Sequence, residues 1–435
     1  MEKKKQDKKN VFVIGLDDFN LSMLHHLPEA GYCRFLPAIK FEEIRGVSHF
    51  SIDDLIKTAE QRIAEAGSID AIITYFDFPA SVMVPLIAMK YKLDGPSITS
   101  VLKCEHKYWS RLEQKKVIPE AIPAFTAFDP YDKKVWQKID FQPPFWIKPV
   151  KSYHSYLAYR ITDKDSFLNA LEEVKEKIEY LTEPFSEILK KNKVPAKLSS
   201  MKQTMFAETE IGGIQGTVEG YVYNNEVIIY GIVDTIKEKH CPSLACYQYP
   251  SDLPYEVQYR MAELSRKVIE QIGLNNCAFN IEYFYDEETN DINLLEVNPR
   301  MSQSHAYMFE KVHGISHHHV IINLALGKRP KPLKYEGEFT LAGHFMLRAF
   351  NPGVIKKVPG KRKVDALKNK YSDLIIKINV KEGMHLDNMD EHHIDSYSYV
   401  LADIYLGADD ENQLLKKYNT VVKELDICVS EDASS

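Results

Sequence analysis

Two strand-like segments near the middle of the chain restrict the possible folds more than any other feature of the sequence. Phe279–Tyr285 and Ile292–Arg300 are rich in β-branched, aromatic and other apolar residues, and the polar segment Asp286–Asp291 separates them. Two such runs joined by a short polar turn are typical of a β-hairpin. We therefore predict an antiparallel pair of strands here.

The predicted hairpin carries two carboxylates on one face. Side chains alternate between the faces of a strand, so Glu282 shares a face with Asn280, and Glu296 shares a face with Asn298. Folding the hairpin brings Glu282 and Glu296 almost opposite each other, and one residue of asymmetry would make them direct neighbours. Like charges in that position repel, so a cation is expected between them. Carboxylate and amide oxygens suit Mg²⁺, which usually also binds substrate phosphates, and the hairpin therefore indicates half of a magnesium–nucleotide site.

The bulk properties exclude several classes of protein. The chain has 435 residues, 44% of them hydrophobic, which is enough for two to four domains or subdomains. A net charge of −7 gives no global attraction to nucleic acid or to an anionic membrane. Six scattered cysteines favour a reducing cytoplasm, and the best apolar run, Val82–Met89, is too short to span a membrane. Residues 1–10 are basic and are expected to form a disordered tail.

The order of the remaining elements predicts an α/β protein. Strands alternate with helices over residues 11–100, which indicates a parallel α/β unit, and no Gly-x-Gly-x-x-Gly motif follows its first strand. Further on, we expect an amphipathic helix over Asp165–Leu181 and then an exposed excursion over Pro184–Lys202. The C-terminal part is α/β again, with strands over Phe339–Arg348, Leu374–Val380 and Tyr397–Leu406 and a helix over Asp410–Leu425.

Three charged residues have both a structural and a functional interpretation. Lys148 lies in an apolar strand, where a buried cation needs an anionic partner, although a lysine at a strand end can also extend to solvent. Lys107 alone is better explained as part of a solvated helix face. Glu208 precedes a turn that contains two glycines and could be a hinge that grips a base, or an ordinary hairpin turn.

Taken in order, these residues resemble the motifs of the ATP-grasp superfamily of ligases. Lys107, Lys148, Glu208 and the Glu282/Glu296 hairpin follow one another as in that superfamily, and Asn298-Pro299-Arg300 resembles its carbamoyl-phosphate synthase and biotin carboxylase branch. The resemblance extends over nearly the whole chain and is greatest for single-domain amino-acid ligases. It implies a Rossmann-like pre-ATP domain (11–100), an ATP-grasp domain (101–330, with a small lobe at about 140–210) and a C-terminal α/β subdomain (331–435).

The resemblance also implies roles for individual residues. Arg300 would be catalytic, because a planar guanidinium suits an acyl-phosphate or a carboxylate. The expected ligands of ATP are Lys107, Lys148, Ser155, Glu208 and Gln215, and those of Mg²⁺, or alternatively Mn²⁺, are Glu282, Glu296 and Asn298. Two features depart from the family pattern: Gln215 stands where a ribose-binding glutamate is frequent, and the loop 151–156 contains no glycine.

The implied reaction joins a small-molecule carboxylate to an amine through an acyl-phosphate, with release of ADP and phosphate. Two alternatives remain, a biotin carboxylase-like enzyme that activates bicarbonate and a non-catalytic nucleotide-binding protein. Ser304 stands where the biotin carboxylase pattern has a catalytic glutamate, and the glycine-free loop motivates the non-catalytic alternative. A homodimer is implied by the resemblance only.

Two further groups of residues have weaker assignments. The segment that contains Asp234, Lys237, His240 and Tyr249 is expected to line the substrate pocket. The run 317–319 consists of three histidines, but consecutive helical residues diverge too much to share one metal. We expect this run to be a solvated helix start.

Overall fold

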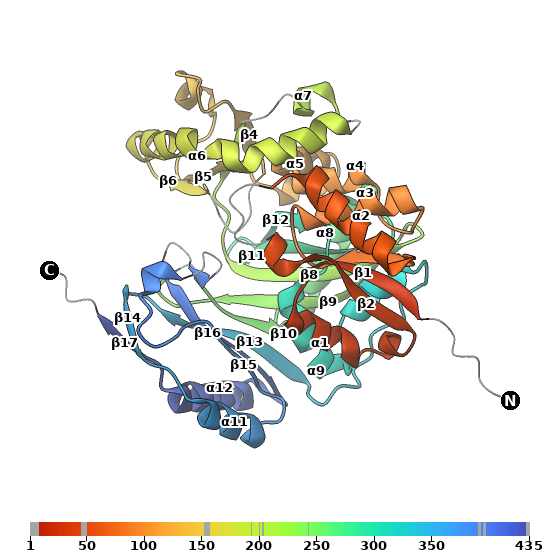
Figure 1. The fold of residues 1–435 in the computed structure, drawn as a ribbon. Coiled ribbons are helices and arrows are strands. Elements are labelled where there is room, and N and C mark those ends of the chain that lie inside the picture. The colour runs from red at the N-terminus through yellow and green to blue at the C-terminus, as the bar shows by residue number, and fades with distance from the viewer. Residues whose placement is uncertain are drawn as a thin grey trace.

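The N-terminal part of the protein is a parallel α/β unit (Figure 1). The computed structural model describes residues 8–44, 50–151, 157–192, 194–199, 201, 204–241, 243–389, 393–394 and 397–431. In the first sheet, β1 lies between β2 and β3 and is parallel to both, as predicted for residues 11–100. The elements of this unit are β1 (Lys9–Leu16), α1 (Asp18–His26), η1 (Pro28–Gly31), β2 (Cys33–Lys40), η2 (Phe41–Glu43), α2 (Ile52–Ala66), β3 (Ala71–Thr74) and α3 (Ala80–Tyr91).

Two short helices lead from this unit to a small antiparallel sheet of order β4-β7-β5-β6. The elements are α4 (Ile98–Glu105), α5 (Lys107–Lys115), η3 (Pro119–Ala121), β4 (Phe125–Phe128), η4 (Val135–Lys138), β5 (Phe145–Pro149), β6 (Tyr159–Ile161), α6 (Lys164–Lys191), α7 (Ala196–Ser199) and β7 (Met205–Thr209). The expected end of the helix near residue 181 is wrong, because α6 continues through Pro184 to Lys191. Phe185, Ile188 and Leu189 on this extension are buried, so its apolar face packs in the core instead of forming an exposed excursion.

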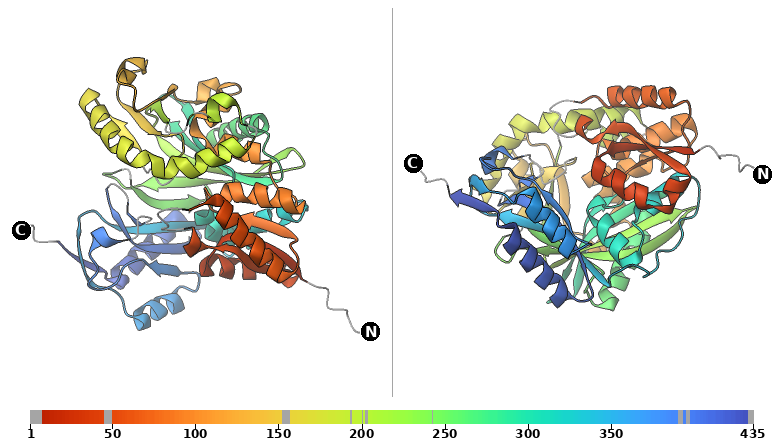
Figure 2. Two further views of the ribbon diagram at one scale, coloured as in Figure 1. Left: turned by 45° about the horizontal axis from the view of Figure 1, so that its top comes forward. Right: turned by 60° about the horizontal axis from the view of Figure 1, so that its bottom comes forward.

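The rest of the chain is organised around one eight-stranded sheet of order β12-β11-β8-β9-β10-β13-β16-β15. Helices pack around this sheet, and a two-stranded sheet of β14 and β17 lies at the C-terminal end (Figures 1 and 2). The elements are β8 (Ile214–Tyr223), β9 (Glu226–Lys237), β10 (Leu244–Tyr249), α8 (Tyr255–Ile272), β11 (Cys277–Asp286), β12 (Asp291–Asn298), η5 (Gln303–His305), α9 (Ala306–His313), α10 (His318–Ala325), β13 (Leu341–Ala349), β14 (Gly353–Lys357), α11 (Lys361–Lys370), β15 (Ile375–Ile378), η6 (Leu386–Asn388), β16 (Tyr399–Ala408), α12 (Glu411–Leu425) and β17 (Cys428–Glu431).

The expected C-terminal subdomain shares this sheet with the preceding region. Strand β13 pairs with β10, and Cys246 lies opposite Phe345, so hydrogen bonds of the sheet connect the two sides of residue 331. The C-terminal elements themselves match the predicted ones closely. The helix expected over Asp410–Leu425 is α12, whose N-cap is Asp410: its carboxylate accepts a hydrogen bond from the N–H of Gln413 at 2.8 Å. The domain boundaries as such stay a prediction.

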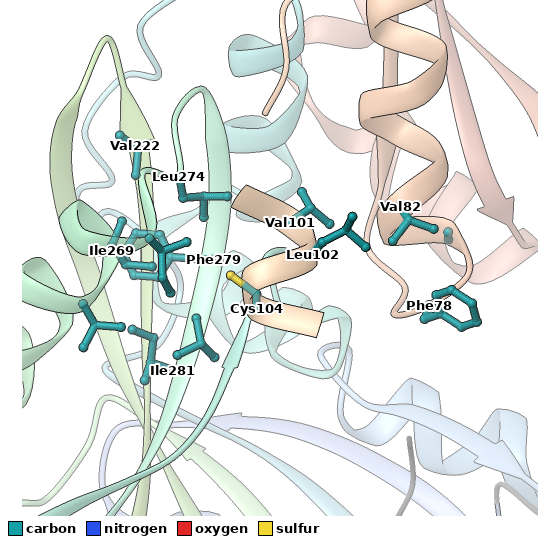
Figure 3. Packing of buried hydrophobic residues seen from close by; sticks show 14 of the residues in the cluster. Phe78, Val82, Val101, Leu102, Cys104, Val222, Ile269, Leu274, Phe279 and Ile281 are labelled. Atoms are coloured by element: carbon teal, nitrogen blue, oxygen red, sulfur yellow. The ribbon is translucent and has the colours of Figure 1, made fainter. Parts of the chain in front are cut away.

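A continuous hydrophobic core fixes the N-terminal unit against the large sheet. Figure 3 shows Val101 and Leu102 of α4 between Val82 of α3 on one side and Leu274 and Phe279 of the large-sheet region on the other. All five side chains are buried. Helix α4 therefore packs between the N-terminal unit and the strand that carries Glu282, and this packing fixes their relative position.

The described part of the chain has no helix that is both long and apolar enough to cross a membrane. The six cysteines are free thiols.

Candidate active site

The predicted carboxylate pair is confirmed by the register of β11 and β12. Glu282 lies directly opposite Glu296, and Asn280 lies opposite Asn298. The register shifts by one residue between Glu282 and Tyr283, because Leu295 on β12 has no partner on β11. This β-bulge supplies the asymmetry that the sequence argument required.

Amide groups surround Glu282 on the same face. Gln215 Nε2 on β8 donates to Glu282 Oε2 at 3.1 Å. Asn298 Nδ2 donates to Asn280 Oδ1 at 3.0 Å and approaches Glu282 Oε1 at 3.4 Å. Three of the residues expected from the sequence, Gln215, Glu282 and Asn298, are therefore in contact.

Burial and the neighbouring carboxylate of Glu296 raise the pKa of Glu282 to about 7. A group with this pKa would be stabilised in its charged form by a bound cation. The two carboxylates and the Asn298 amide fit Mg²⁺. This ion is commonly bound by only one or two carboxylates of the protein together with phosphate oxygens of the substrate. The described residues contain no group of three or more His, Cys, Asp or Glu side chains arranged for a metal, so the remaining ligands would come from nucleotide and water.

A pH dependence follows from the raised pKa of Glu282. In the folded chain this carboxyl holds its proton up to about pH 7, whereas in the unfolded chain it ionises near 4.5. Stability therefore falls between pH 4.5 and 7, and above pH 7 the whole penalty is present. We expect Glu282→Gln to raise the Tm of the metal-free protein at pH 8 and to change it little at pH 4.5. Thermal unfolding at both pH values checks this, and an equal Tm at pH 8 would contradict the assignment.

Three lysines converge on the carboxylates of the site. Lys107 begins α5 and pairs with Glu296, Lys148 on β5 pairs with Glu208, and Lys151 pairs with Glu105. Burial alone would lower the pKa of Lys107, but Glu296 outweighs burial and the pKa is raised. The structure thus brings Lys107 and Lys148, the two lysines expected to bind phosphate, together beside the hairpin.

Burial dominates at Lys148 and lowers its pKa, and the nearby cations Lys107 and Arg111 act in the same direction against Glu208. An anionic ligand such as a polyphosphate would favour the charged form of this buried lysine.

Arg300 lies at the end of the hairpin and binds a carboxylate of the N-terminal unit. Its Nε and Nη2 donate to the two oxygens of Asp77 at 2.6 and 2.7 Å, which is a bidentate arrangement. Burial would lower the pKa of Arg300, but Asp77 outweighs burial and raises it. No sequence signal pointed to Asp77, because it follows β3 more than two hundred residues before Arg300.

Glu208 has different neighbours from those expected. Its carboxylate is buried and is bound by Arg111 and Lys148, which together outweigh the effect of burial and lower its pKa to about 2. Both carboxylate oxygens therefore have cationic partners, and any contact of Glu208 with a base stays a prediction. Arg111 was missed, although it follows Lys107 by four residues and so shares its helix face. Ser155 and most of the loop 151–156 lie outside the described residues.

Two expectations about the pocket are changed by the structure. Asp234 is buried and accepts hydrogen bonds from Ser251 Oγ at 2.5 Å and the N–H of Asp252 at 2.7 Å, so it organises a turn. The Tyr249 hydroxyl lies 2.6 Å from His313 Nε2 in the core. Neither side chain is available to line an open pocket.

The expectation of a solvated histidine run is wrong. His317, His318 and His319 are buried, because helix α10 packs its start between the sheets. They contact Tyr230, Asn20 and Glu29, respectively. These contacts are structural and explain why an apolar segment carries three imidazoles.

Comparison with known proteins agrees with this geometry. Residues 141–306 match the model of the ATP-grasp domain family. This part of the chain, residues 141–306, is therefore an ATP-grasp domain by its match to that family. The match confirms the resemblance to ATP-grasp ligases that the sequence predicted, and the fold confirms the expected α/β class.

Several solved enzyme structures resemble nearly the whole chain in fold. An L-amino acid ligase from Bacillus licheniformis has a TM-score of 0.72 at 17% identity, covering 98% of this chain and 100% of that one. Phosphoribosylglycinamide synthetase from Anaerococcus prevotii has a TM-score of 0.63 at 15% identity, with coverage of 98% and 100%. Biotin carboxylase from Campylobacter jejuni has a TM-score of 0.63 at 16% identity, with coverage of 97% and 92%. At these identities the likeness concerns the fold.

One curated protein matches part of this chain. The C-terminal section of the large chain of carbamoyl phosphate synthase from Methanopyrus kandleri is 30% identical over 105 residues. The match covers 23% of this chain and 19% of that protein, so the chain matches about a fifth of the length of this relative.

Proposed function

We propose that this ATP-grasp protein is an ATP-dependent carboxylate–amine ligase. The observation that carries the proposal is the in-register pair Glu282 and Glu296 with Lys107 and Lys148 beside it. Two carboxylates suit a divalent cation, and two lysines suit the phosphates that the cation would share. Bound Mg²⁺ would neutralise the charge that develops on the transferred phosphoryl group.

The proposed reaction has two balanced steps. A substrate carboxylate oxygen attacks the γ-phosphorus of ATP, and the bond from that phosphorus to the bridging oxygen of ADP breaks. An amine then attacks the acyl carbon of the resulting acyl-phosphate, the bond from that carbon to the phosphate oxygen breaks, and the departing inorganic phosphate takes up the proton that the amine loses. Phosphoryl transfer of this kind needs positioning and charge neutralisation and no nucleophilic side chain of the protein.

Side chains of the protein would supply the positive charge that binds phosphate and would orient the substrate. An ammonium has three donors, so Lys107 and Lys148 would bind phosphate oxygens in addition to their carboxylate partners when nucleotide binds. Arg300, whose guanidinium Asp77 orients, would face the acyl-phosphate or the substrate carboxylate. Gln215 could hydrogen-bond a ribose hydroxyl with its amide, although its Nε2 is bound to Glu282 in the structure.

An assay of phosphate release over a panel of amino acids, offered singly and in pairs with ATP and Mg²⁺, tests the proposal. We expect release that depends on a carboxylate and an amine together, with a ligated product detected by mass spectrometry. Bicarbonate with biotin forms a separate arm, and strict dependence on that arm would contradict the proposal. Tight ATP binding with no ADP formation in any arm would favour a non-catalytic nucleotide-binding protein instead.

A further inference from the structure

Arg111 on α5 contacts two parts of the candidate site at once, Glu208 of the small sheet and the backbone of the hairpin. Its Nε and Nη2 donate to Glu208 Oε2 at 3.1 and 2.9 Å, and its Nη2 also donates to the backbone carbonyl of Leu295 at 2.8 Å. Its Nη1 donates to Gln114 Oε1 at 2.6 Å, one turn along the same helix. The Arg111 side chain is 3% exposed, so these contacts form away from solvent.

The carbonyl that Arg111 binds belongs to the bulged residue of the hairpin. Leu295 is the residue of β12 without a partner on β11, and the bulge at this position sets Glu296 opposite Glu282. A bulge re-aims neighbouring side chains and leaves local backbone groups outside the regular ladder. The guanidinium therefore binds the backbone at the point that fixes the register of the two carboxylates.

The carboxylate that Arg111 binds belongs to the other wall of the site. Glu208 uses one oxygen for Arg111 and the other for Lys148, so Arg111 orients Lys148 through Glu208. Lys107 lies one turn before Arg111 on the same helix and pairs with Glu296. Helix α5 thus connects β5 and β7 of the small sheet to β12 of the large sheet.

We propose that Arg111 is a positioning residue that holds the Leu295 bulge and the Glu208–Lys148 pair in the relative geometry needed to bind Mg²⁺–ATP. This proposal rests on the nucleotide site of the proposed function, but it does not depend on which carboxylate or amine is ligated. A lysine could not replace Arg111, because a single ammonium lacks the planar set of donors that reaches Glu208, Leu295 and Gln114 together.

Calorimetric titration of ATP with Mg²⁺ into wild type and variants tests the proposal. We expect Arg111→Met and Arg111→Lys to raise the Kd for ATP at least tenfold. Arg62→Met is the matched control, because Arg62 also binds a carboxylate in a bidentate manner, Glu43 at 2.7 and 2.8 Å, together with a backbone carbonyl, Ala38 at 3.2 Å. It lies in the N-terminal unit, and its substitution should change the Kd less than twofold.

A comparison of stability with affinity separates positioning from packing. Arg62→Met and Arg111→Met each remove a guanidinium that binds a carboxylate and a backbone carbonyl, so both are expected to lower the Tm. Only Arg111→Met should raise the Kd for ATP when both variants are titrated at a temperature at which both are folded. A Kd raised to the same extent in both variants would overturn the proposal and leave Arg111 a purely structural residue.

Hydrogen–deuterium exchange gives a readout that does not depend on nucleotide. Arg111→Met should speed exchange selectively over residues 291–300, and Arg62→Met should not. Unchanged exchange there, or an unchanged Kd in folded Arg111→Met, would refute the inference. Wild-type protein that binds no ATP would refute the proposed function as well, whereas ATP binding without ligation would leave the Arg111 inference in place.

Discussion

Glu296→Gln is expected to reduce ATP-dependent phosphate release by at least about a thousandfold, an energetic loss of roughly 4 kcal/mol in the transition state. The carboxylate charge is needed twice, once opposite Glu282 for the divalent cation and once as the partner of Lys107. An amide of the same shape keeps the packing but supplies no charge. Steady-state phosphate release at saturating ATP and Mg²⁺ measures the effect.

The control for this prediction lies on the same hairpin. Glu288 is exposed in the turn between β11 and β12, so Glu288→Gln removes an equal charge from the hairpin away from the site. We expect wild-type activity for this variant and a Tm within a few degrees of wild type for both. A folded Glu296→Gln protein with wild-type turnover would remove Glu296 from the metal site.

Phe279→Ala is expected to destabilise the protein by about 3–5 kcal/mol, the usual cost of removing a large aromatic side chain from a packed core. Phe279 is fully buried on β11, three residues before Glu282. It covers Gly220 on the neighbouring strand so closely that a Cβ atom at Gly220 would lie 2.4 Å from the Phe279 ring. Truncation therefore opens a cavity that the backbone of two paired strands must close. Urea unfolding measures the change in free energy.

Tyr259→Ala serves as the comparison, because this aromatic residue of α8 is 55% exposed. Its loss should change the free energy of unfolding by less than about 0.5 kcal/mol. A cost at Phe279 as small as the cost at Tyr259 would mean that the core around α4 and β11 is not packed as described. Because Phe279 and Glu282 share a strand, we also expect Phe279→Ala to weaken ATP binding.

Together the two predictions separate the effect of charge at the site from the effect of the core packing that holds the site in place. Glu296 contributes to the reaction and little to stability, whereas Phe279 contributes to stability and acts on the site only through the strand. The large sheet connects them, since β11 carries Phe279 on its core face and Glu282 toward the site.

Much of the fold could be predicted from local pattern. The first sheet, the hairpin and the C-terminal helix follow from short-range periodicity, because alternation of side chains and turn residues act within about ten residues. The extension of α6 could not be predicted, since Pro184 indicates a break and only burial of Phe185 and Ile188 reveals the continuous helix. The burial of His317–His319 was missed for the same reason, because their partners lie on other elements.

The sequence by itself determined the identities and the order of the charged residues. Through them it determined the resemblance to ATP-grasp ligases and the face of the hairpin on which Glu282 and Glu296 lie. These properties depend on residue type and on alternation along one strand. Only the tertiary structure decided which charges meet: Asp77 with Arg300, Arg111 with Glu208, and the Leu295 bulge that brings Glu296 into register. The physical reason is that ion pairs between distant segments depend on how the sheets pack, and the packing is set by the buried core as a whole.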